Sequence, residues 1–107
     1  MMIPEVVEKL QECQADHVVI AGIEAHVCVQ QTALDLLRNG YYVHIAADAV
    51  SAQDASDVEL MKGRLTAAGA NISSSLSILY EIMGTAKHPA FKEVFGHVKN
   101  HMDQSKL

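Results

Sequence analysis

Cys28 is the residue best placed for covalent chemistry in this chain of 107 residues. It follows a short apolar run, 17–22, and opens an apolar pattern with helical spacing. Unpaired backbone N–H groups and the helix dipole in a first helical turn favour the nucleophilic thiolate, and the same N–H groups can stabilise an oxyanion. The alternative is a small residue that fills a gap in the core, because free cysteine is among the most buried residue types. Position alone favours that alternative.

Two polar residues, Glu24 and His26, come just before Cys28. Residues two apart on a helix do not face each other, so a loop or capping role for His26 is favoured over the role of a base for Cys28. Glu24 could act as an acid or a ligand, but a solvated loop residue is the simpler interpretation. Asp48, further along the chain, is expected to hydrogen-bond the amides of the loop that follows it.

The hydrophobic pattern predicts the elements that position Cys28. A helix over 4–14 is followed by a strand over 17–22, a helix over 26–39 and a strand over 42–47. The first strand is apolar on both faces, which is typical of a buried parallel sheet. Strand, helix and strand within about 30 residues form a βαβ unit, and such sheets gather their chemistry at the carboxyl edge, where Cys28 falls.

Turn and capping residues predict the order of the remaining elements. These are a loop over 48–55, a helix that has Ser56 or Asp57 as its N-cap and ends near Gly69, a short strand over 71–74, a helix closed by Gly84, and a last helix after Pro89.

Composition excludes several classes of protein. The formal net charge of −5 argues against nucleic acid as the main partner, because phosphate binding needs clustered Lys and Arg. The two cysteines lack the spacing of a disulfide scaffold and fit a reducing compartment. The longest apolar run, 18–23, is far shorter than the ~20 residues that span a bilayer, and no secretory signal is present, so no membrane partner is expected.

The last three residues, Ser105, Lys106 and Leu107, match the peroxisomal import address, which is read by a receptor. The polar residues before them would leave this tripeptide accessible. The sequence therefore predicts a protein of the peroxisomal matrix with the import receptor as a partner. If the tail is not read, the prediction is a cytoplasmic protein.

Residues 18–35, VVIAGIEAHVCVQQTALD, resemble the nucleophile motif of the isochorismatase-like cysteine hydrolases. Residues 40–49, GYYVHIAADA, are similar to the next strand of that family. The segment 88–93, HPAFKE, looks most like the animal isochorismatase domain-containing proteins. The resemblance covers nearly the whole chain.

The resemblance implies a doubly wound, Rossmann-like parallel α/β sheet of about six strands. Residues 1–107 would form one truncated domain, an incomplete half with about three strands and flanking helices. The family implies hydrolysis of a C–N amide bond, or of the vinyl ether of isochorismate, through a Cys, an Asp and a Lys. It also implies a small-molecule substrate, no metal or other cofactor, and association into homo-oligomers.

By position, Cys28 takes the place of the family's nucleophile. The Ile23–Glu24 peptide takes the place of its cis non-proline bond, and the backbone N–H groups of Glu24 and Cys28 take the place of its oxyanion hole. Many members carry Thr-Asp where this chain has Ala25-His26, so His26 is a candidate substrate contact.

The family's Asp and Lys have no counterpart in this chain. The only Asp before Cys28 is Asp16, in the turn at the wrong end of the strand, and the only Lys is Lys9, on the first helix. Two functions therefore stay open. One is an isochorismatase-like hydrolase that is impaired here, and the other is a non-catalytic isoform or interaction module that keeps the import signal.

Overall fold

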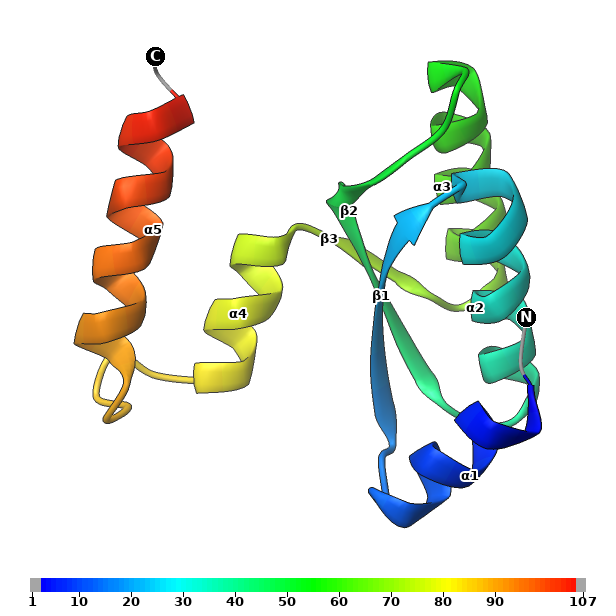
Figure 1. Ribbon diagram of the computed structural model, residues 1–107, viewed down its shortest axis with the longest axis horizontal. Helices are drawn as coiled ribbons and strands as arrows, with labels where there is room; N and C mark the ends of the chain where they lie inside the picture. Colours follow the sequence, from blue (N-terminus) through cyan, green and yellow to red (C-terminus); the bar gives the residue numbers. More distant parts are fainter. Residues whose placement is uncertain (1–2, 106–107) are drawn as a thin grey trace. The chain divides into compact units, whose positions relative to one another are not determined.

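Helices and strands alternate along most of the chain (Figure 1). The structure, a computed structural model, describes residues 3–105, and the side chains of residues 3–100. Its contacts divide the chain into two compact units, 1–75 and 76–107, which are described separately. The elements are α1 (Pro4–Glu12), β1 (His17–Ile23), the π-turn η1 (Ala25–Val29), α2 (Gln30–Arg38), β2 (Tyr42–Ser51), α3 (Ala55–Ala68), β3 (Asn71–Ser73), α4 (Ser75–Met83) and α5 (Phe91–Ser105).

The first unit is built on a three-stranded parallel sheet in the order β1-β2-β3. Its helices α2 and α3 pack against the same face of the sheet (Figure 1). This confirms the predicted α/β class, with three parallel strands and flanking helices. It also places η1 directly after the carboxyl end of β1.

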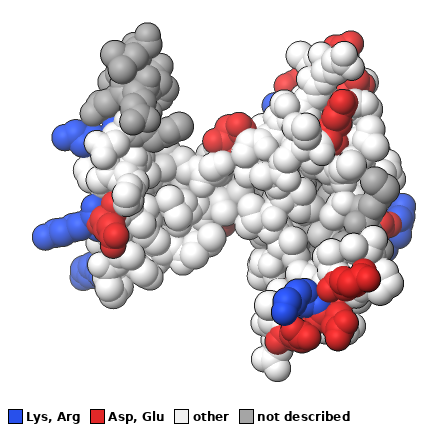
Figure 2. Space-filling view, in the orientation of Figure 1, with Lys and Arg blue, Asp and Glu red and all other residues white. Residues whose placement is uncertain are grey.

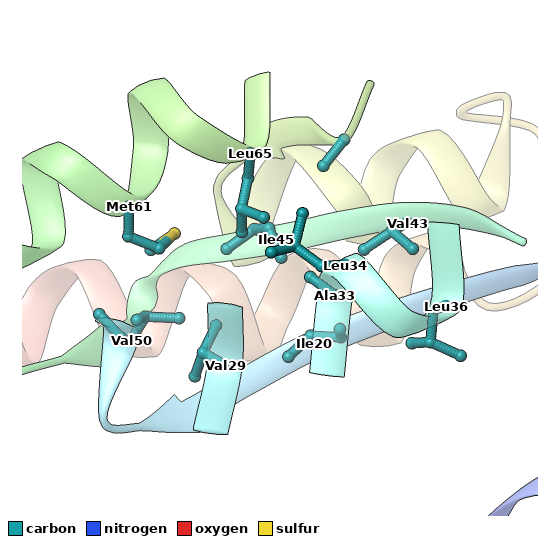
Figure 3. Packing of buried hydrophobic residues seen from close by; sticks show 12 residues of the cluster. Ile20, Val29, Ala33, Leu34, Leu36, Val43, Ile45, Val50, Met61 and Leu65 are labelled. Carbon is teal, nitrogen blue, oxygen red and sulfur yellow. The ribbon is translucent and has the colours of Figure 1, made fainter. Parts of the chain in front are cut away.

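The core lies between this face of the sheet and the two helices (Figure 3). Ile45 of β2 and Leu36, Met61 and Leu65 of the helices are almost completely buried. Burial of each such side chain stabilises the fold by about 1.5–3 kcal/mol relative to its exposure. The alternation of buried and exposed residues along β2 shows that its other face lacks comparable cover, because Tyr42 is exposed while Val43 is buried.

Two local predictions are wrong. Residues 48–51 were expected in a loop, but β2 continues to Ser51, because Gly22 and Ile23 pair with Val50 and Ser51 beyond a register shift in β1. The N-cap of α3 is Asp54, not Ser56 or Asp57, and its carboxylate accepts the Ser56 N–H at 2.9 Å. Asp and Ser are equally good caps, so the sequence offered no way to choose among neighbouring candidates.

β1 lies at one edge of the sheet and is paired with β2. Its inner face carries the buried Ile20, whereas the outward residues Val19 and Ile23 are 48% and 69% exposed. The prediction of a strand buried on both faces is therefore wrong for this chain. An edge strand without Lys, Pro or a charged side chain has none of the features that discourage pairing with another chain.

The second unit consists of α4 and α5 joined by a short connection. α4 ends at Gly84, which has a φ of +75°, as its position in the sequence predicted. Aromatic rings link the two helices, with the centroids of Tyr80 and Phe91 5.9 Å apart. Among the described residues, no helix combines the length and the apolar character needed to cross a membrane.

The exposed edge of β1 leads to a prediction about association. We expect the purified chain to self-associate as its concentration rises, measured by sedimentation velocity, and Val19→Lys to weaken this association by placing a charge on the edge. Leu60→Lys is the control, because Leu60 is also an exposed apolar residue but lies on α3, away from the edge strand. A wild-type chain that sediments as a monomer at every concentration would contradict the prediction.

Candidate functional site

Cys28 lies in η1, just beyond the carboxyl end of β1. The Ile23–Glu24 peptide that joins the two elements is cis, which confirms the conformation implied by the resemblance. The carbonyl of Glu24 accepts the N–H groups of Val27 and Val29, both at 3.2 Å. This wide turn sets Cys28 between two residues whose N–H groups are already bonded.

The thiol of Cys28 is exposed. Ala25 and Val29 of the same turn are 0% and 3% exposed and fill the core beneath it. The interpretation of Cys28 as a buried gap-filling residue is therefore wrong. Within residues 3–100, whose side chains are described, the thiol has no hydrogen-bond or ion-pair partner.

His26 lies on a different side of η1 and lines an open cleft of about 510 Å³. Its Nε2 is 3.7 Å from a carboxylate oxygen of Glu24 and 3.9 Å from one of Asp57, at the start of α3. Its Nδ1 is buried and, among the described residues, has no hydrogen-bond partner. Cys28 does not line this cleft, which agrees with the expectation that residues two apart do not share a helical face.

The cleft is acidic. The residues around it are Glu24, His26, Gln53, Asp54, Ala55 and Asp57. Figure 2 shows acidic side chains on the first unit and no extended basic surface on the face in view. Asp54 and Asp57 were not predicted as neighbours of Glu24. The signal that could have found them is the parallel pairing itself, since it brings the segment after β2 beside the segment after β1.

The structure keeps Asp16 and Lys9 away from Cys28, as predicted. Asp16 precedes β1 and so lies at the end of the sheet where the strands begin, opposite to the end that carries Cys28. Lys9 pairs with Glu12 within α1 at 3.2 Å. Asp48 hydrogen-bonds a backbone amide, as expected, but that amide belongs to Ser75, 27 residues further on. The Ser75 hydroxyl donates to the same oxygen at 2.9 Å.

A family model of the isochorismatase domain matches residues 2–76, which include β1, η1, α2, β2, α3 and β3. The chain belongs to the isochorismatase domain family. The chain is 43% identical over 95 residues to isochorismatase domain-containing protein 2 of Xenopus laevis, covering 88% of this chain and 46% of that protein. It is 41% identical to isochorismatase domain-containing protein 1 of Danio rerio, covering 100% of this chain and 38% of that protein.

Solved structures of isochorismatase-like proteins share this fold. The MAR1 ribonuclease of Caenorhabditis elegans superposes with a TM-score of 0.84 at 38% identity, over 90% of this chain and 49% of that one. A pyrazinamidase/nicotinamidase of Streptococcus mutans superposes with a TM-score of 0.62 at 27% identity, over 64% of this chain and 39% of that one. The chain therefore has the fold of a hydrolase family, and it spans about half the length of the relatives it matches.

Asp54 provides a test of how the cleft is held together. Hydrogen bonds from the backbone N–H and then the hydroxyl of Ser56 lower the pKa of Asp54 from its usual 3.8, and the charge of His26 adds to this. Because the pKa of Asp54 is lower in the folded chain than in the unfolded chain, the ionised carboxylate stabilises the fold at pH values above the pKa of the unfolded chain. This contribution is lost as the pH falls through the pKa of the folded chain.

We expect Asp54→Ala to lower the free energy of unfolding at pH 7 and to have a progressively smaller effect below about pH 4, measured by urea titration at several pH values. Asp54→Asn keeps an N-cap acceptor without the titrating charge and serves as the control. An equal effect of Asp54→Ala at pH 7 and pH 3 would contradict this account.

Proposed function

We propose that this isochorismatase-domain chain carries the nucleophile of a cysteine hydrolase that cleaves C–N amide bonds of small molecules. The observation that carries the proposal is the exposed Cys28 thiol, which follows the cis Ile23–Glu24 peptide at the carboxyl edge of the sheet. The nicotinamidase among the structural neighbours supports an amide over the vinyl ether of isochorismate. The net charge of −5 disfavours RNA as the substrate, because RNA binding depends on basic side chains.

The proposed reaction proceeds through a thioester. The Cys28 sulfur, as a thiolate, attacks the carbonyl carbon, and the N–H groups of Glu24 and Cys28 stabilise the oxyanion. The C–N bond then breaks as the nitrogen takes up the proton that the Cys28 thiol gave up. Water cleaves the thioester, which releases the acid and restores the thiol. His26, on the other side of η1, is assigned to substrate contact and not to proton transfer.

Catalytic groups that act as a unit lose most of their effect together when one is missing. Proton transfer to and from Cys28 needs an acceptor, and in the described structure the Asp16 and Lys9 side chains lie elsewhere. We therefore propose that the chain by itself has little or no amidase turnover, and that Cys28 remains a reactive thiol that forms a thioester only with an activated ester. Its complete activity would require groups from further polypeptide.

An activated ester separates these steps. With p-nitrophenyl acetate we expect rapid release of about one equivalent of nitrophenol and then slow turnover, with the acetyl group found on Cys28 by mass spectrometry. Cys28→Ser should abolish the burst. Cys13→Ser is the matched control, because Cys13 is also a free, exposed cysteine. Equal acetylation of both cysteines would contradict a specialised role for Cys28.

A non-catalytic interaction module is the second candidate. It is favoured by the open edge of β1 and by the lack of a polar partner for Cys28 among the described side chains. The same ester assay distinguishes the two functions, because an interaction module would show no burst that depends on Cys28.

We also propose that the chain acts in the peroxisomal matrix, delivered by the import receptor through Ser105, Lys106 and Leu107. The support is the sequence alone, since Lys106 and Leu107 lie outside the described residues and the Ser105 side chain is not described. Its substrates would then be small-molecule amides that are present in that compartment.

Fluorescence microscopy tests this location. A chain with a fluorescent protein fused at its N-terminus should coincide with a peroxisomal marker, and removal of Leu107 should make the signal diffuse. Lys99→Ala is the control, because it changes a residue near the C-terminus but outside the tripeptide, and it should leave the punctate pattern unchanged. A diffuse signal from the intact tail would contradict the proposal.

A further inference from the structure

Glu24 takes part in three different features of the candidate site. Its backbone carbonyl accepts the N–H groups of Val27 and Val29, both at 3.2 Å, and so closes the turn η1. Its backbone N–H is one of the two donors assigned above to the oxyanion. Its side-chain carboxylate lies beside the ring of His26. The position of this one residue therefore affects both the turn and the stabilisation of the oxyanion.

His26 links Glu24 to the start of α3. Nε2 of His26 is 3.7 Å from Oε2 of Glu24 and 3.9 Å from Oδ2 of Asp57. Both distances are longer than a direct hydrogen bond, so the attraction is electrostatic. The pKa of Asp54, which the hydrogen bonds from Ser56 lower, is lowered further by the charge of His26. Three carboxylates of the cleft therefore interact with the same ring.

The two ring nitrogens of His26 have different surroundings. Nε2 faces the carboxylates of Glu24 and Asp57, which accept hydrogens, whereas Nδ1 is buried and has no partner among the described residues. The hydrogen of the neutral ring therefore lies on Nε2. The positive end of the ring is directed at both carboxylates, and the link does not require a second proton.

His26 also separates like charges. Among the residues that line the cleft, it is the one that can carry a positive charge, and Glu24, Asp54 and Asp57 are acids. Asp54 and Asp57 belong to the start of α3, so the helix sets their positions. Glu24 lies in the connection between β1 and η1. Without His26, repulsion among these acids would therefore act mainly on Glu24 and move it away from α3.

We propose that His26 is a positioning residue, which holds Glu24 against the start of α3 and so keeps the Glu24 N–H in the oxyanion site. This inference rests on the proposed function of Cys28. The role is additional to substrate contact, and no bond or proton is transferred through His26. The three side chains are 35–42% exposed, so the attraction is that of a partly exposed ion pair and its effect on the rate is moderate.

Two reactions of Cys28 test this role. Acylation by p-nitrophenyl acetate passes through an oxyanion, whereas alkylation by iodoacetamide displaces iodide and forms none. His26→Gln should slow acylation by roughly two- to fivefold and leave the alkylation rate unchanged. Asp57→Asn should act in the same direction, because it weakens the link to α3 while His26 and Glu24 remain. His26→Lys keeps a positive group beside the carboxylates and should recover most of the acylation rate.

His97→Gln is the matched control, because His97 is an exposed histidine on α5, outside the cleft, and neither rate should change. Both rates are measured at Cys28 by mass spectrometry, and circular dichroism establishes that each variant is folded. If His26→Gln does not fold, Asp57→Asn carries the test.

The outcomes separate this inference from the proposed function. A wild-type chain without acylation at Cys28 would overturn both. Normal wild-type acylation that His26→Gln leaves unchanged would overturn the inference alone. Equal slowing of acylation and alkylation by His26→Gln would also overturn it, because the effect would then lie on the thiol or on the fold and not on the oxyanion site.

Discussion

Within the first unit, helices bury one face of the sheet only, and most properties of this unit depend on that fact. Ile20, Val43 and Ile45 pack against α2 and α3, and the hydrophobic burial on this side holds the three strands in parallel register. The outward side chains of the same strands, such as Val19 and Tyr42, remain exposed. A parallel sheet normally has both faces covered, so this unit combines a well-packed core with an uncovered surface.

The same one-sided burial explains the state of the candidate site. Ala25 and Val29 anchor η1 in the core, which fixes the turn while leaving the Cys28 thiol exposed. The acidic cleft is formed on the other side of η1, by segments that follow β1 and β2. Cys28 is therefore close in sequence to the cleft residues Glu24 and His26, but η1 places the thiol and the cleft on different sides of the turn. The chain spans about half the length of the relatives it matches.

The sequence predicted the elements of this fold well, because each is bounded by a residue with a strong local preference. Gly69 and Gly84 both have positive φ values and end their helices where expected. The extension of β2 to Ser51 was missed because it depends on pairing with Ile23, a contact made across the fold that no local pattern encodes. At the site, the family motif identified the cis peptide after Ile23. The bond from Ser75 to Asp48 and the approach of Asp57 to His26 could not be predicted, because their partners are far apart in the sequence.

Gly22 shows how narrowly the position of the thiol is specified. Its φ of +124° falls where L-amino acids are strained, yet a Cβ atom built there would meet no other atom within 4 Å. The requirement for glycine is thus one of chirality and not of space. A D-alanine introduced at this position by chemical synthesis would satisfy the backbone, whereas L-alanine would not. The positive φ of this one residue is thus part of the path that the chain takes from β1 toward Cys28.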